Sequence, residues 1–99
     1  ETKLPPVKIT PMLEPWQQTL LEAAEYLRGH NWCQGRYSIG ESVCLVGAIR
    51  EVKGFFTDGE SYNRVKRYLR EGPESWNDFK AKSKEEVIWV LEACALKGE

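Results

Sequence analysis

Apolar residues recur every three or four positions in several segments of the chain, which is the spacing of one face of an α-helix. In the first segment Trp16 and Leu20 belong to one such stripe, Pro15 stands at the start, and Gly29 follows the end. Proline is tolerated at a first helical position and glycine is typical just beyond the last. The pattern predicts a helix over residues 15–28.

Two later segments open with the sequence of a capping box, in which a Ser or Thr hydroxyl and a Glu carboxylate bind otherwise unpaired backbone N–H groups. The first, TDGE, begins at Thr57 and predicts a helix that runs to about Glu71 and is ended by Gly72. The second, SKEE, begins at Ser83 and predicts a final helix that is ended by Gly98.

A further helix is predicted for the segment SVCLVGAIREV, with Ser42 as its N-cap. It is apolar nearly all round its first two turns, so we expect it to be central. Gly47 inside it indicates a close helix contact, because glycine costs about 1 kcal/mol relative to alanine there. Upstream, Gly35 and Gly40 flank a short Arg-Tyr-Ser-Ile run that predicts a turn or a small β-hairpin, with a positive φ at Gly35.

These elements predict a mainly α fold, a single small domain of about four helices with a short β-hairpin or turn between helices 1 and 2. With 99 residues the chain is long enough for one core and too short for two. Its 41% hydrophobic and 29% charged residues are typical of a folded domain and not of a disordered chain. We expect an extended N-terminal arm over residues 1–14 and one helical domain over residues 15–99.

The net charge and the number of cysteines indicate the possible partners and the cellular compartment of the protein. Fourteen Lys and Arg against fifteen Asp and Glu leave a formal charge of −1, so no global field attracts nucleic acid or an anionic membrane. No apolar run approaches the roughly 20 residues that span a bilayer, and the first residues lack the apolar core of a secretory signal. Three cysteines are an odd number for a disulfide-stapled secreted domain. We therefore expect a cytoplasmic protein with reduced thiols and no membrane contact.

The segment HNWCQGRYSIGESVC raises the question of a metal site, because it contains His30, Cys33 and Cys44. Zinc ligands usually come in two closely spaced pairs. Cys44 and Cys94 are instead isolated on apolar helical stripes, where a free cysteine packs as a small hydrophobe. We expect no metal and no other cofactor.

A catalytic thiol is the sharper alternative for the same segment. Cys44 would stand in the first turn of a helix, where the helix dipole lowers the pKa of a thiol, and His30 could serve as its base. The apolar neighbours of Cys44 act in the opposite direction, because burial raises the pKa and blocks substrate. We therefore assign no catalytic residue and keep Cys44 and His30 as the weak candidates.

The succession LLEAAEYL, WCQG, CLVGAI, WNDF and EEVIWVLEACA, over about residues 19–96, resembles a family of small bacterial and bacteriophage proteins known only as a domain of unknown function. The most specific parts of the resemblance are WCQG, CLVGA and WND. It implies a small, mostly helical cytosolic domain and brings no activity, cofactor or catalytic residue. Family members often have a longer insertion between WCQG and the CLVGA helix, whereas this chain has only the short RYSIGESV.

The motif residues have a structural and a functional interpretation. In the structural one, which we favour, Trp32 and Trp76 anchor turns on the core, since buried indoles usually serve packing. Asn77 and Asp78 would then form Asx-turns or cap the local turn. In the functional one, Asn77 and Asp78, with Gln34 as a neighbour, form a polar pocket beside the two tryptophans, suited to a small ligand or a peptide.

A second candidate surface is the outer face of the segment SYNRVKRYLR. Arg64, Lys66, Arg67 and Arg70 spread over this face with Asn63 among them, and four cations together suit phosphates. The alternative is a solvated helix whose cations pair with neighbouring Glu residues. We favour that alternative, because the domain is neutral and lacks a recognisable DNA-binding motif.

The final helix is apolar on two sides. Val87 and Leu91 belong to its core face, whereas Trp89, Ala93 and Leu96 form a second stripe on nearly the opposite side. Such a stripe must be covered by the N-terminal arm or by a second protomer. The pattern does not decide between an arm and a homodimer.

The sequence favours a non-catalytic interaction or small-ligand-binding module. Nucleic-acid binding through the basic helix at residues 61–70 is the second choice. A thiol-dependent enzyme comes third.

Overall fold

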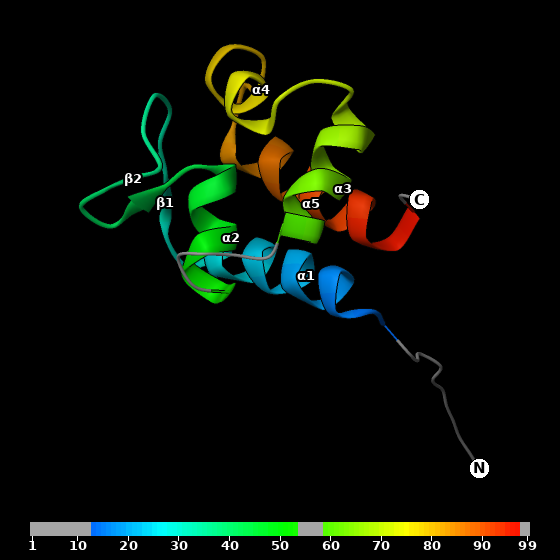
Figure 1. The fold of residues 1–99 in the computed structure, drawn as a ribbon. Helices are drawn as coiled ribbons and strands as arrows, with labels where there is room; N and C mark the ends of the chain where they lie inside the picture. The colour runs from blue at the N-terminus through cyan, green and yellow to red at the C-terminus, as the bar shows by residue number, and fades with distance from the viewer. Residues whose placement is uncertain (1–12, 54–58, 98–99) are drawn as a thin grey trace.

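The structure, a computed structural model, describes residues 13–53 and 59–97. Helices dominate it: α1 (Pro15–Arg28), α2 (Leu45–Lys53), α3 (Gly59–Leu69), α4 (Pro73–Phe79) and α5 (Lys84–Lys97). Three short strands, β1 (Asn31–Trp32), β2 (Ser38–Ile39) and β3 (Ser42–Val43), lie between α1 and α2 (Figure 1). The mainly α class and the small β element between the first two helices are confirmed. α4 is a further short helix, where the sequence predicted only a turn.

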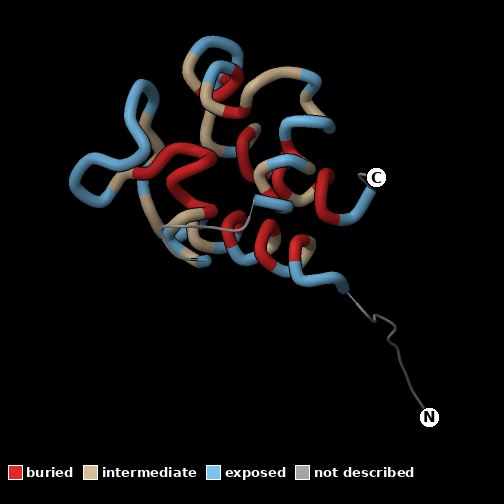
Figure 2. The backbone as a smooth tube through the Cα atoms, in the orientation of Figure 1, coloured by how far each residue is buried: buried red, intermediate tan, exposed pale blue. Residues whose placement is uncertain are grey.

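The core lies where the helices face one another (Figure 2). α1 packs most extensively against α5 and then against α2, and α4 packs against α2 and α3. Leu20 of α1, Leu45 of α2, Val65 of α3 and Leu91 of α5 are fully buried in this core. Truncating such a leucine to alanine typically costs about 2–5 kcal/mol, so these contacts carry much of the stability of the fold.

α1 has the bounds that its sequence predicts, with Pro15 in its first turn and Gly29 just past its end. Its N-cap is Glu14, whose backbone N–H donates to the side-chain oxygen of Gln17 at 2.7 Å. The amide nitrogen of Gln17 also donates to the backbone oxygen of Ala95 at 2.7 Å. The first turn of α1 is thereby tied to the last turns of α5.

The capping motif that begins at Ser83 is confirmed in its hydroxyl half, whereas the carboxylate of Glu86 bonds the residue before Ser83. The N–H of Glu86 donates to the hydroxyl of Ser83 at 3.1 Å. The carboxylate of Glu86 accepts a bond from the N–H of Lys82 at 2.8 Å. Val87 and Leu91 are fully buried, as the apolar stripe predicts.

The end of α3 differs from the prediction. Thr57, the first residue of the predicted capping box, lies outside the described residues. α3 ends at Leu69 instead of Glu71, because Arg70 adopts a left-handed conformation with φ 64°. Gly72, which was expected to end this helix, instead stands at the N-cap of α4.

The strands form a small sheet in the order β1-β3-β2. β1 pairs with β3 in parallel, with Trp32 opposite Val43, and β2 pairs with β3 as an antiparallel hairpin. The positive φ predicted at Gly35 is confirmed at 82°. Ser42 lies in β3, so its assignment as the N-cap of α2 is wrong.

The expected N-terminal arm lies almost entirely outside the described residues, since only residues 13 and 14 of it precede α1. Within residues 13–53 and 59–97, no helix has both the length and the apolar character needed to cross a bilayer.

Candidate ligand site

The side chain of Asn77, on α4, connects the segments that carry the sequence motifs. Its oxygen accepts hydrogen bonds from the indole N–H of Trp32 at 2.7 Å and from the backbone N–H of Leu45 at 3.1 Å. Its nitrogen donates to the backbone oxygen of Cys33 and to the carboxylate of Asp78, both at 3.1 Å. A carboxamide offers two donors and two lone pairs, and all four are used. The fully buried Asn77 therefore caps α2 from another helix.

Two further bonds fasten the WCQG segment to the same helix. The amide nitrogen of Gln34 donates to the backbone oxygens of Asn77 at 2.8 Å and of Ala81 at 3.3 Å. The N–H of Gly35 donates to Asp78 Oδ1 at 2.8 Å. The structure thus brings together four of the five ligand-binding candidates, and Trp76, the fifth, is buried in the core. The polar side-chain atoms of Trp32 and Asn77 are satisfied within this network, so these two residues hold the neighbouring surface in place.

A hollow of about 230 Å³ opens beside the network, between the loop at residues 35–37 and α4. Its lining is Gly35, Arg36, Tyr37, Cys44, Glu74 and Asp78. Of the five ligand-binding candidates, only Asp78 lines it. Pockets for drug-sized ligands usually have about 300–1,000 Å³, so this hollow suits a smaller molecule.

Two carboxylates of α4 face this hollow from successive turns. Glu74 and Asp78 are four residues apart, which places them on one face of the helix. Glu74 accepts hydrogen bonds from the hydroxyls of Tyr62 at 2.8 Å and Tyr37 at 3.2 Å. Partial burial and then the bond to Glu74 raise the pKa of Tyr62 to about 12. Both carboxylates are therefore held in fixed positions by donors of the protein itself.

Glu74, Tyr37 and Tyr62 were not among the site residues predicted from the sequence. The spacing of Glu74 and Asp78 could have found the acidic pair, but only if residues 73–79 had been recognised as a helix. No signal in the sequence places Tyr37 and Tyr62 on the same carboxylate, because the contact joins a loop, α3 and α4.

The positive charges around the hollow are not paired with these carboxylates. Within the described residues, no Lys or Arg lies within ion-pair distance of Glu74 or Asp78. Arg36 lines the hollow, and the guanidinium of Arg50 lies over the ring of Tyr37 at 4.0 Å. The hollow therefore presents two fixed negative groups with one arginine at its border.

The two candidates for thiol chemistry have different environments. Cys44 is 3% exposed, its sulfur accepts a bond from the N–H of Gly47 at 3.3 Å, and burial raises its pKa. The ring of His30 is stacked on Tyr26 at 3.9 Å, and its Nδ1 lies 2.8 Å from the backbone oxygen of Tyr26. His30 therefore packs on Tyr26 of α1 through one ring face and through Nδ1. Burial also raises the pKa of Cys94, to about 11.

The described residues contain no group of three or more His, Cys, Asp or Glu side chains that could hold a metal ion.

The nucleic-acid candidates separate into two groups. Arg64 bonds to Glu60 at 2.9 Å, and its guanidinium lies over the ring of Trp16 at 4.3 Å. Lys66, Arg67 and Arg70 instead line a different hollow. Only the second group is available for a ligand.

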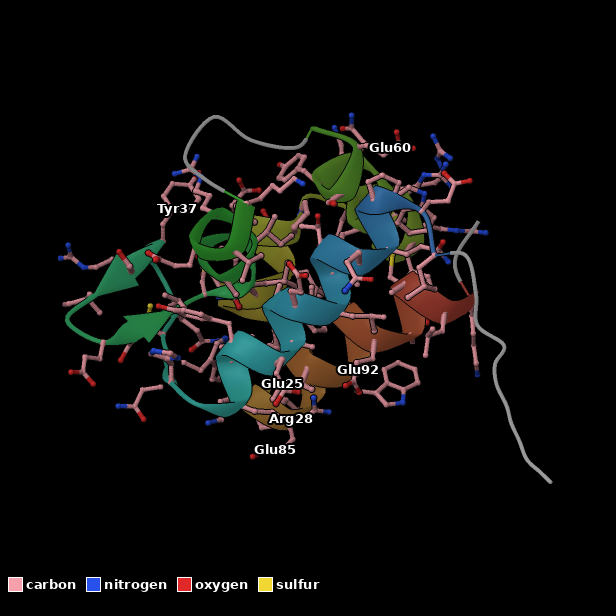
Figure 3. The ribbon with its side chains drawn as sticks, turned by 90° about the horizontal axis from the view of Figure 1, so that it is seen from below. Glu25, Arg28, Tyr37, Glu60, Glu85 and Glu92 are labelled. Carbon is pink, nitrogen blue, oxygen red and sulfur yellow. The ribbon has the colours of Figure 1, made fainter. Side chains whose placement is uncertain are left out.

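The three interface candidates differ in their exposure to solvent. Trp89 is 59% exposed and Leu96 is 63% exposed, whereas Ala93 is buried. The hollow beside Trp89 is lined by Ile88 and by side chains of both charge signs. Figure 3 shows part of this surface, where Arg28 lies close to Glu25 and Glu92.

The fold and this geometry define a small, mainly helical domain with a polar hollow held by buried hydrogen bonds. The chain belongs to the family of unknown function DUF6197, whose model matches residues 12–97. This confirms the expectation of a family without an assigned function. Comparison with curated proteins and with solved structures gives no match.

Proposed function

We propose that the protein is a non-catalytic binding module, and that its ligand is a small polar molecule with an ammonium group, bound in the hollow between the loop at residues 35–37 and α4. The observation that carries this proposal is the pair Glu74 and Asp78. Both carboxylates face one hollow, and neither has a cation of the described residues within ion-pair distance.

Charge and geometry support this choice of ligand. Two like charges one helical turn apart repel each other, and a cation between them relieves that repulsion. Because the tyrosine hydroxyls and the N–H of Gly35 already hold the carboxylates, little side-chain entropy is lost when a ligand binds. Arg36 offers a partner for an anionic group on the same ligand, so an amino acid fits the site best, and a small amino alcohol would use only the two carboxylates.

The state of Cys44 supports a binding role over thiol catalysis. Burial raises the pKa of this thiol, so it is protonated at neutral pH and is a poor nucleophile. Among the described residues, the ring of His30 bonds to the backbone oxygen of Tyr26, and the sulfur of Cys44 bonds to the N–H of Gly47, so no hydrogen bond joins the two candidates. Cys44 then contributes packing at the floor of the hollow.

The proposal is tested by calorimetric titration with ethanolamine, glycine and lysine, with acetate and glycerol as probes that lack an ammonium group. We expect dissociation constants of about 1 mM for the best amine, given how few atoms it can place in contact. Asp78→Asn and Glu74→Gln should each weaken binding at least about tenfold, since a lost charge-assisted hydrogen bond is worth about 1.5–3 kcal/mol.

Glu85→Gln is the matched control, because it removes one exposed carboxylate from α5 and should leave binding unchanged. Melting temperatures of all variants distinguish a lost site from a lost fold. Binding of acetate or glycerol as tight as that of the amines would contradict the proposal, as would undiminished amine binding by folded Asp78→Asn.

A further inference from the structure

A second hollow, of about 460 Å³, lies on the outer face of α3 and is separate from the proposed ligand site. Its lining is Asn63, Lys66, Arg67, Arg70 and Glu71. Asn63, Lys66 and Arg67 stand at positions i, i+3 and i+4 of α3, which lie on one side of the helix, and Arg70 follows directly after the last helical residue, Leu69. At 1.5 Å per residue the helical part from Asn63 to Leu69 is about 9 Å long, and Arg70 extends the row to about 10 Å.

The cations in this row are available to a ligand. Among residues 13–53 and 59–97, no carboxylate lies within ion-pair distance of Lys66, Arg67 or Arg70. Glu71, the acidic residue of the hollow, is paired with Lys80 at 3.0 Å. The expectation that the cations of this helix pair with neighbouring Glu residues holds only for Arg64, which is bonded to Glu60. Although the domain is nearly neutral overall, three cations without an ion-pair partner among the described residues therefore lie together at this hollow.

The backbone at Arg70 is a second observation. Its φ of 64° is a conformation in which glycine is strongly favoured, and the N–H of Arg70 donates to the oxygen of Lys66 at 2.8 Å. Gly72 stands two residues later, so the chain has an arginine at the position that would best suit a glycine. Strained backbone of this kind concentrates at functional sites. The left-handed turn places Arg70 at the end of the row that Lys66 and Arg67 begin.

We propose that this basic row binds the phosphate backbone of a nucleic acid, without reading its bases. Each strand of a duplex carries one phosphate per about 3.4 Å of axis, so a row of about 10 Å meets several phosphates. A row of this length exceeds the size of one phosphate group, which favours a polyanion over a single phosphate ligand. Asn63 adds a neutral donor for a phosphate oxygen at the other end of the row.

The test measures fluorescence anisotropy of labelled DNA and RNA oligonucleotides with the full chain over a series of salt concentrations. With about three phosphate contacts, the logarithm of the binding constant should fall with the logarithm of salt concentration with a slope of about −2 to −3. Arg67→Glu should abolish binding at low salt. Lys53→Glu, which makes the same charge change at the end of α2, should weaken binding only slightly.

Arg70→Gly separates binding from folding. It removes one guanidinium and also relieves the left-handed strain, so binding should weaken at least about threefold, with a salt slope reduced by about 1, while the melting temperature rises by about 4 °C. A purely structural role for Arg70 would not produce these opposite changes.

Three results would overturn the inference. The first is no binding of DNA or RNA by the wild type at low salt. The second is equal binding by Arg67→Glu when that variant melts like the wild type. The third is binding of inorganic phosphate or pyrophosphate without binding of either oligonucleotide, which would assign the row to a small phosphate ligand.

Discussion

The indole N–H of Trp32 donates a hydrogen bond of 2.7 Å to the side-chain oxygen of Asn77, although 45 positions separate the two residues in the chain. The same oxygen accepts the N–H of Leu45 at the start of α2. One buried carboxamide therefore holds together the WCQG segment, the CLVGA helix and the WND helix. The candidate ligand site lies directly beside this junction, because the adjacent Asp78 lines the hollow.

Asn77→Ala should destabilise the protein strongly. It leaves the N–H groups of Trp32 and Leu45 buried without their acceptor, and each such group costs about 1–3 kcal/mol. We expect a loss of about 2–5 kcal/mol in the free energy of unfolding, measured by urea denaturation. Asn31→Ala, at an exposed asparagine of β1, should change it by less than about 0.5 kcal/mol. Equal effects of the two variants would show that the junction contributes little.

Gly47→Ala should be destabilising although alanine is the better helix former. A Cβ atom at Gly47 would clash with the backbone oxygen of Tyr37, so either α2 or the loop must move. The close neighbour is thus the backbone of the β-hairpin and not another helix, which corrects the prediction from sequence.

We expect a net loss of about 1–3 kcal/mol for this overpacking, measured by urea denaturation. Gly59→Ala is the control, because no atom of the described residues lies within 4 Å of its added Cβ atom. It should leave stability unchanged or raise it slightly. An unchanged midpoint for Gly47→Ala would contradict the close approach of the loop.

The pKa of Tyr62 predicts a pH dependence. In the folded protein it is raised from 10.0 to about 12, so the folded state holds the phenol proton more tightly than the unfolded state does. This contribution to stability is fully present below pH 10 and is lost as the pH rises towards 12.

The measurement is a phenolate absorbance titration of the wild type against Tyr62→Phe, which isolates the signal of this one tyrosine. Glu74→Gln should move the pKa of Tyr62 down towards 10.0, since the carboxylate both accepts a hydrogen bond from the hydroxyl and repels the phenolate charge. An unshifted titration in Glu74→Gln would contradict the hydrogen bond between the two side chains.

Trp89→Glu tests the proposal that the final helix pairs with its own copy. The indole is 59% exposed, and a two-fold dimer is the commonest homo-oligomer. If a second protomer covers the stripe, light scattering should show a dimer for the wild type and a folded monomer for the variant. A monomeric wild type at micromolar concentration would end the dimer proposal. An unfolded or aggregating variant would instead indicate that the indole is covered within the protomer.

The sequence predicted those elements whose signals are local. Pro15 and Gly29 mark α1 correctly, and the Ser83 motif marks the start of α5, because each signal lies within a few residues of the helix end. The prediction failed where tertiary contacts replace local ones. Ser42 has the chemistry of an N-cap, but Asn77 supplies that acceptor from another helix.

The residues of the candidate site were also predicted only in part from the sequence. The motif residues Gln34, Asn77 and Asp78 were selected from sequence and do meet in space. Glu74 was missed because α4 is only seven residues long, too short for periodicity to reveal it. Its tyrosine partners come from other elements, and no local pattern encodes such a meeting.

The proposed ligand site is tested most directly by the amide chemical shifts of the wild type in two-dimensional NMR during titration with ethanolamine, glycine and lysine. We expect saturable shifts at the amides of Gly35, Tyr37 and Asp78, with the amide of Trp89 unmoved, and we expect these shifts to be lost in Asp78→Asn. Shifts that never saturate, or that fall away from the loop at residues 35–37 and α4 for every amine, would contradict the site.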